Sequence, residues 1–171
     1  MLVKSVLGAA VFAATALADL TSVNNALIKI NKDIGSLNTT INGWDGQLFS
    51  AIPILAQSWG LEGTIKSGTK TADSSGPLNF DETLVIADST ADVAISAHSI
   101  LANMVATKPK FDKIIVGTPF ALGILKNLRN ETAALATSII SKVPAELQPI
   151  AKELVGGIDA DFAAAVKTYG G

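Results

Sequence analysis

Few side chains in this chain could carry out chemistry. There is no cysteine, and His98 is the only histidine. A thiol nucleophile is therefore excluded, and only one imidazole is available as a general base. The sequence also contains no Gly-x-Ser-x-Gly, the signature of a serine nucleophile on an α/β-hydrolase fold. The residue types alone favour a protein that is not an enzyme.

Paired carboxylates are the next group that could bind or react. Asp88 and Asp92 are four residues apart, which places them on one face of a helix, and Asp159 and Asp161 are two apart. A metal site needs more ligands than either pair supplies. We therefore interpret these residues as solvated carboxylates and predict no metal site and no cofactor.

His98 has three interpretations. It falls between Ile95 and Leu101 in what reads as the apolar face of a helix. A single histidine at such a position is most often a hydrogen-bonded core residue. It could instead bind the polar headgroup of a ligand at the end of an apolar cavity, or act as a catalytic base.

The N-terminal residues have the pattern of a secretory signal. Lys4 supplies a positive charge, residues 6–17 form a short apolar run, and Ala16-Leu17-Ala18 is a small-x-small cleavage site. The run is too short to span a bilayer, which takes about 20 apolar residues. We therefore expect a signal peptide at residues 1–18, a single domain at residues 19–171 and no transmembrane segment.

Composition narrows the class of protein further. The formal net charge is −2, and nucleic-acid binding would need clustered Lys and Arg. An exported domain without cysteine must be held together by packing instead of disulfides. Two sequons, at Asn38 and Asn130, are candidate N-glycosylation sites that should face solvent.

A long apolar stripe opens the predicted domain and predicts a helix over residues 21–42. Its members recur at spacings of three and four: Leu20, Val23, Leu27, Ile30, Ile34, Leu37, Ile41 and Trp44. The helix should stop at Asn42-Gly43, a turn signal. Such a stripe could form an intermolecular coiled coil or one wall of a closed bundle within the chain.

Two further helices are expected before residue 110. One covers residues 46–71 and is interrupted or frayed by its glycines. Asn79, with Glu82 three residues later, fits a capping box that starts the next helix. That helix should end before Lys108-Pro109, because a residue preceding proline is disfavoured in the helical region. Its apolar face is read as Leu84, Ala87, Ala91, Ala94, His98, Leu101 and Val105.

The last part of the chain predicts two more helices. One begins near Phe111 and is either kinked or restarted at Thr118-Pro119. The other begins at Pro144 and buries a face that runs from Leu147 to Tyr169. No segment alternates with period two for long enough to predict a strand. The expected fold is an all-α antiparallel bundle of about five helices.

The apolar faces can be interpreted in two ways. They form an ordinary filled core, which any such bundle requires, or they line a cavity. Several seam positions carry alanine, including Ala91, Ala94 and Ala121. Small residues serve close helix packing, but they equally leave room for an acyl chain between the helices.

The whole predicted domain resembles a known family. The matching pieces, in order, are Asp19-Leu20, Gly68-Thr69 followed by Ala72, Lys108-Pro109-Lys110-Phe111, Lys142-Val143-Pro144, and the closing Phe162 and Tyr169. Together with the helix lengths and the absence of cysteine, they resemble the fungal hydrophobic-surface-binding protein and cell-wall galactomannoprotein family. The resemblance covers about residues 19–169.

The resemblance implies a secreted, non-catalytic helical domain. Members adsorb to hydrophobic surfaces and help to recruit secreted hydrolases, and related galactomannoprotein domains hold fatty acids in an apolar tunnel. We therefore expect a fatty acid or other long-chain lipid to bind between the helices. The alternative is a structural cell-wall mannoprotein or adsorption factor without bound lipid. The expected lipid-binding residues are Ile30, Ile34, Leu37, His98, Leu101, Val105, Leu125, Leu128, Leu154 and Ile158.

Overall fold

The computed structural model describes the backbone of residues 3–171 and the side chains of residues 19–171. The chain forms five long helices: α1 (Val3–Gly43), α2 (Ile52–Ser74), α3 (Phe80–Phe111), α4 (Gly117–Lys142) and α5 (Gln148–Thr168). A short 3-10 turn, η1 (Phe49–Ala51), precedes α2, and residues 3–171 contain no strand. The prediction of an all-α fold with about five helices is confirmed.

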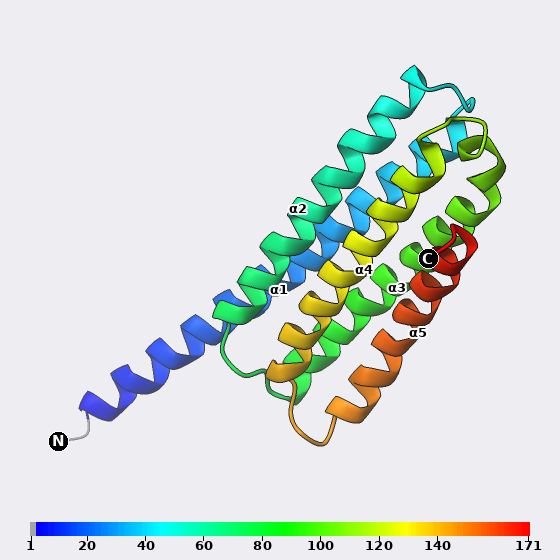
Figure 1. Ribbon diagram of the computed structural model, residues 1–171. Helices are drawn as coiled ribbons and strands as arrows, with labels where there is room; N and C mark the ends of the chain where they lie inside the picture. Colours follow the sequence, from blue (N-terminus) through cyan, green and yellow to red (C-terminus); the bar gives the residue numbers. More distant parts are fainter. Residues whose placement is uncertain (1–2) are drawn as a thin grey trace.

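The helix α1 begins before the predicted domain. Its first turns extend past the other helices (Figure 1). The predicted signal peptide, residues 1–18, lies outside the residues whose side chains are described. From Val23 onward the predicted stripe is buried as far as Trp44, and Leu20 is partly buried against the core. The stripe is thus one wall of a bundle within the chain.

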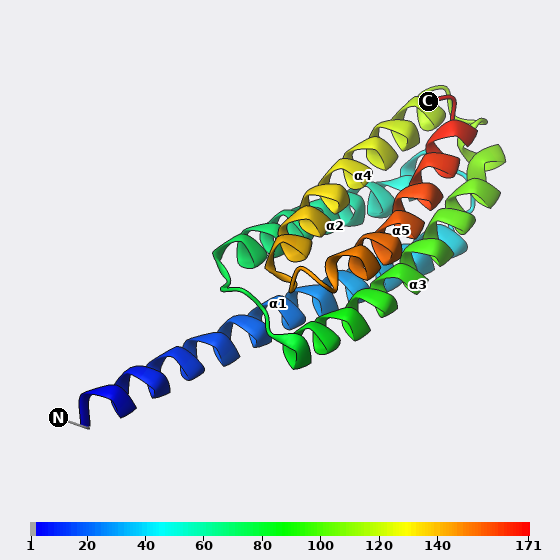
Figure 2. The same cartoon turned by 90° about the horizontal axis from the view of Figure 1, so that it is seen from below.

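The five helices form a closed ring. Around it, α1 packs against α2, α2 against α4, α4 against α5, α5 against α3, and α3 against α1 (Figure 2). Consecutive helices run in opposite directions because their connections are short, as predicted for an antiparallel bundle. Three neighbouring pairs in the ring are nevertheless parallel, namely α1 with α3, α2 with α4, and α3 with α5.

Recurrent polar contacts mark these parallel pairs. The hydroxyl of Ser89 on α3 donates to Asn24 on α1, and Ser138 on α4 donates to Asp73 on α2. The hydroxyl of Tyr169, just after α5, donates to the Met104 carbonyl of α3 at 2.7 Å. Each contact joins residues 65 apart in the chain. The helices of each parallel pair therefore share a common register.

Several predicted helix boundaries are corrected. The helix α2 begins at Ile52 instead of residue 46, and it runs through its glycines without interruption to Ser74. The capping box of α3 is present as predicted: the Asn79 side chain accepts from Glu82 N–H, and the Glu82 carboxylate accepts from Asn79 N–H. The helix passes Pro109, however, and ends at Phe111. Proline is tolerated there because the helix ends two residues later, so a local distortion displaces little of it.

The remaining boundaries follow from turns at the two ends of the bundle. Residues 112–116 form a loop, so α4 starts afresh at Gly117, with Pro119 in its first turn. A Cβ at Gly117 would lie 2.4 Å from the Phe111 carbonyl oxygen, so this tight turn requires glycine. The helix α5 begins at Gln148 instead of Pro144.

The predicted apolar face of α3 is wrong in register. Leu84 is exposed, whereas the buried residues include Ile86, Val93, Ala97 and Met104. The error arises because α3 packs against both α1 and α5, which buries a broader arc than a single seam. Among the described residues, α3 is also the one helix long and apolar enough to cross a membrane, a property that core helices of bundles share.

Candidate functional site

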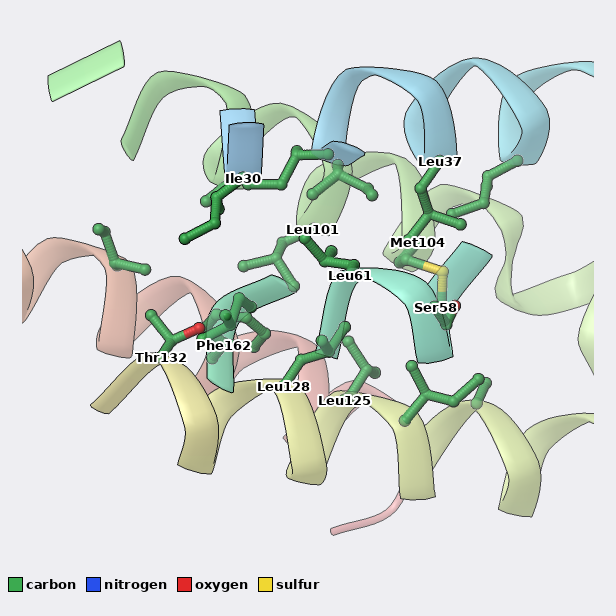
Figure 3. A pocket seen from close by; sticks show the side chains of 18 of the residues that line it. Ile30, Leu37, Ser58, Leu61, Leu101, Met104, Leu125, Leu128, Thr132 and Phe162 are labelled. Carbon is green, nitrogen blue, oxygen red and sulfur yellow. The ribbon is translucent and has the colours of Figure 1, made fainter. Parts of the chain in front are cut away.

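The centre of the helix ring holds an apolar cavity of about 60 Å³. Each helix contributes side chains at helical spacings, for example Ile30 and Leu37 from α1 and Leu125 and Leu128 from α4 (Figure 3). The two residues in the lining with polar side chains are Ser58 and Thr132. A lining of this kind suits a hydrocarbon and offers water almost no hydrogen-bond partners.

The cavity follows from the ring arrangement. Five helices around a circle leave more space at the axis than four do, and long side chains are needed to fill it. Two alanines, Ala97 on α3 and Ala121 on α4, point side chains of minimal size into that space. The centre is therefore left incompletely filled, although most of its lining residues belong to the buried core.

A second apolar space adjoins the central cavity. This chamber of about 190 Å³ lies between α3, α4 and the first half of α5. Its lining shares four residues with the cavity: Val93, Thr132, Leu135 and Ile158. These side chains border both spaces, so changes of their rotamers would alter the boundary between the two.

The structure places most of the predicted site residues around these spaces. Seven line the central cavity: Ile30, Ile34, Leu37, Leu101, Leu125, Leu128 and Ile158. Leu154 lines the adjoining chamber, as Ile158 also does. Val105 lines neither, because it lies on the outer side of α3 and is 37% exposed. Its inclusion followed from the misplaced face of that helix.

His98 is also displaced from the predicted position. Its side chain is 72% exposed, and its Nδ1 lies 2.9 Å from an Asp161 carboxylate oxygen on α5. Ala97 and Leu101, beside it on α3, are the residues that face the cavity. The placement of His98 in the apolar seam is therefore wrong. In this position it forms a surface contact between α3 and α5 and cannot reach a ligand inside the ring.

Comparison with known proteins identifies the family. The family model for hydrophobic surface binding protein A matches residues 20–141. This chain belongs to that family. The resemblance found in the sequence is thereby confirmed, and no curated protein matches the chain.

Solved structures confirm the fold of this family member. Afmp4p in complex with palmitic acid is 23% identical, with a TM-score of 0.84 over 88% of this chain and 99% of that one. Ligand binding domain 1 of the Penicillium marneffei MP1 protein, complexed with arachidonic acids, is 17% identical, with a TM-score of 0.83 over 88% of this chain and 98% of that domain. Domain 2 of the same protein gives 19% identity and a TM-score of 0.81 over 88% and 94%.

The two sequons of this family member differ in their surroundings. Asn130 is exposed on α4. Asn38 is only partly exposed, because its amide donates to Ser99 at 3.1 Å and accepts from Asn103 at 2.8 Å, both on α3. Asn38 therefore faces solvent only in part, and a glycan there would displace these contacts. Asn130 is the better candidate site.

Several charged residues of this family member form surface pairs. The Arg129 guanidinium donates to both Asp159 oxygens, at 2.7 and 2.9 Å, and lowers the pKa of that carboxyl. In the described part of the chain no group of three His, Asp or Glu residues is arranged to hold a metal ion. Asp159 and Asp161 are thus used in separate contacts between helices.

Sequence reasoning missed three parts of the site. The chamber depends on which side of α3 faces inward, and that register was misassigned. Ser58 was not singled out, and Thr132 was placed on the apolar face of its helix but was not chosen as a binding residue. The groove between α4 and α5, lined by Arg129 and Lys152, is formed only when two distant segments pack together.

Proposed function

We propose that this protein binds a long-chain fatty acid or a comparable single-chain lipid inside the helix ring. The observation that carries the proposal is the apolar cavity lined by all five helices, together with the chamber beside it. Relatives with the same fold have been crystallised with palmitic and arachidonic acids. The affinity would come from burial of the chain: at about 25 cal/mol per Å², a few hundred Å² contributes several kcal/mol before the costs of binding.

The proposed ligand requires some rearrangement of the cavity. At about 60 Å³ the central space is small for a long chain. The flexible side chain of Met104 and the four residues shared with the chamber can change rotamer to lengthen it. Binding should therefore depend on the free volume beside Ala97 and Ala121.

Mass spectrometry and ligand displacement test this proposal. Purified protein should release fatty acid on organic extraction and should bind the fluorescent fatty acid cis-parinaric acid, which palmitic acid displaces. Ala97→Leu and Ala121→Leu should fill the cavity and remove this binding. Ala102→Leu, at an exposed position of the same helix α3, is the matched control and should bind normally. Unchanged binding in both filled variants would contradict a site inside the ring.

The proposed function is non-catalytic, and His98 offers the direct test. Its exposed pairing with Asp161 predicts that His98→Ala retains full lipid binding. If the wild-type protein hydrolysed a substrate and His98→Ala did not, the result would instead support an enzyme. We further propose that the protein acts outside the cell, freely secreted or associated with the cell wall, where it could recruit secreted hydrolases.

A second function, adsorption to hydrophobic surfaces, is favoured by one end of the bundle. Two loops at this end expose apolar side chains: Phe49 is 82% exposed and Ile115 is 98% exposed. Leu48, Ile52 and Val116 beside them are also more than half exposed. The Trp44 ring contacts the Phe111 ring, with centroids 4.5 Å apart and the planes tilted by 43°, which ties the starts of the two loops together. We refer to these five exposed residues as the apolar tip.

The apolar tip is presented by an ordered loop. The Asp45 carboxylate accepts from Gln47 N–H and from the Ser50 hydroxyl, and the Trp44 indole donates to the Gln47 carbonyl at 3.0 Å. Lys110 donates to the Trp44 carbonyl. A fixed loop that exposes Phe49 is suited to contact with a hydrophobic phase.

Adsorption to polystyrene or to hexadecane droplets tests the apolar tip. The double variant Phe49→Ser/Ile115→Ser should lose most adsorption and should still bind cis-parinaric acid normally. Ile28→Ser/Ile95→Ser, which removes two exposed isoleucines on the sides of the bundle, is the control and should adsorb normally. Equal loss in both double variants would contradict a role specific to the tip.

A further inference from the structure

We propose that the groove between α4 and α5 is the entrance to the central cavity and that it holds the carboxylate of the bound acyl chain. This inference rests on the proposed lipid-binding function and assigns its route and its polar contacts. The groove has a volume of about 240 Å³ and is lined by one face of each helix, from Arg129 to Ile140 on α4 and from Lys152 to Phe162 on α5.

The groove borders both internal spaces, and two of its residues border all three. Thr132 and Ile158 line the groove, the central cavity and the chamber alike. Phe162 is shared by the groove and the central cavity. A chain that passed between Thr132 and Ile158 would leave solvent and reach either apolar space without crossing another layer of side chains.

A glycine leaves the junction at Thr132 and Ile158 uncovered. The helices α4 and α5 are antiparallel, and the Arg129–Asp159 pair sets their register. In that register Gly156 lies opposite Thr132, and both line the groove. No atom lies within 4 Å of the place a Gly156 Cβ would occupy, so the position is open space. A larger side chain there would cover the junction.

The helix α5 is also held loosely over these spaces. Its buried residues are Ile158, Phe162, Ala165 and Val166, all in the second half. The first half, 148–157, has no buried residue although it covers the chamber. Adjacent glycines at 156 and 157 separate the two halves. This half of the helix could move outward with little loss of packing, which would widen the entrance.

The hydroxyl of Thr132 is available to a ligand. Most helical threonines in this structure donate to the carbonyl four residues earlier, as Thr137 does to Ala133 at 2.8 Å. The Thr132 hydroxyl makes no hydrogen bond with any described residue, and Figure 3 shows its oxygen turned towards Phe162 within the cavity. A donor at the boundary between the apolar space and the groove suits the carboxylate of a fatty acid.

The charges along the groove complete this site. At one end Arg129 is bound by the Asp159 carboxylate, which joins α4 to α5. At the other end Lys152 forms no ion pair with residues 19–171. Asp159 repels a ligand carboxylate, so the headgroup should lie towards Lys152 and accept from Thr132. The Arg129–Asp159 pair then limits how far the two helices can separate.

The rate of ligand uptake tests the entrance. With cis-parinaric acid in stopped flow, Gly156→Leu should slow association by about tenfold. Gly157→Leu is the matched control, because the neighbouring glycine is equally unobstructed yet lines no part of the groove. It should leave the rate unchanged. Equal rates in the two variants, with normal affinity, would overturn the entrance.

The headgroup contacts are tested by comparing palmitic acid with hexadecanol. Lys152→Met and Thr132→Val should each reduce palmitic acid affinity by about tenfold and leave hexadecanol affinity nearly unchanged. Thr137→Val, in the same groove but with its hydroxyl already bonded, is the control. Because Thr132 also belongs to the Asn130 sequon, the proteins should be made in a bacterial host, and Thr132→Ser should restore binding.

The outcomes separate the two proposals. If wild-type protein binds neither palmitic acid nor hexadecanol, the proposed function fails. If it binds both, and the affinity depends on Ala97 and Ala121 but not on Thr132 or Lys152, lipid binding stands and the carboxylate site is overturned.

Discussion

At the residue scale, Tyr169 joins the end of α5 to α3. Its ring contacts Phe111 edge-on, with centroids 6.0 Å apart, and its hydroxyl donates to the Met104 carbonyl. Burial raises the pKa of the phenol. Tyr169→Phe keeps the ring and removes the hydrogen bond, so it should lower the free energy of unfolding by about 1 kcal/mol. Urea titration at pH 7 measures this change.

The same residue predicts a dependence on alkaline pH. Since the folded protein favours the neutral phenol, the contribution of Tyr169 is fully present below the unfolded pKa of about 10. It is lost as the pH rises above that value, because unfolding then releases a proton. Tyr169→Phe should therefore show a smaller fall in unfolding free energy between pH 9 and pH 11. A parallel fall in both proteins would assign the alkaline loss to other groups.

Single residues also show where sequence reasoning fails. His98 and Leu101 differ by three positions, yet one pairs with Asp161 on the surface and the other lines the cavity. An alanine-rich helix gives little contrast between its faces, so a shift of one residue cannot be detected from its pattern. The stripe on α1 was predicted correctly because its large aliphatic residues alternate with polar ones along the whole buried length of the helix.

At the scale of the element, the glycines of α2 fall into two kinds. Gly63 is exposed, and no atom lies within 4 Å of the place its Cβ would occupy. Gly68 is buried where Ile30 and Leu135 would meet an added Cβ at 3.3 and 3.6 Å. The first serves no packing role, and the second permits α1, α2 and α4 to approach closely. The sequence predicted only that the glycines of this helix interrupt or fray it.

Substitutions at these two glycines should have opposite effects on stability. Gly63→Ala should raise the free energy of unfolding by about 1 kcal/mol, the difference in helix propensity. Gly68→Leu should lower it by about 1–3 kcal/mol, because the larger side chain overpacks the crossing. Thermal and urea unfolding of the two variants measures both. Destabilisation by Gly63→Ala would show that this part of α2 is not helical in solution.

Elements with a strong local signal were predicted well, and those defined by tertiary contact were not. The capping box fixed the start of α3 because its two hydrogen bonds involve only Asn79 and Glu82. The starts of α4 and α5 depend on loops at the bundle ends, where Gly117 packs against the Phe111 carbonyl. Such boundaries are set by how the helices meet, which no local pattern contains.

At the scale of the whole molecule, the ring arrangement links stability to ligand binding. Closing five helices around an axis leaves an apolar cavity that the side chains fill incompletely, since Ala97 and Ala121 supply little volume there. Ring closure through α3–α5 and α4–α5 is also what creates the groove. The same feature that costs the free protein packing energy thus provides the proposed site.

This link can be measured by thermodynamic linkage. A ligand that binds only the folded state stabilises it by about 2.7 kcal/mol when present at 100 times its Kd. Palmitic acid should therefore raise the unfolding free energy of delipidated wild-type protein by about that amount at 100 times its Kd. Ala97→Leu should gain nothing from palmitic acid, because the added side chain occupies the space of the acyl chain. It should also match or exceed the stability of the free wild type, since it fills a void.

If palmitic acid stabilised Ala97→Leu and wild type equally, the acyl chain would bind outside the ring, and the exposed apolar tip would become the site to examine.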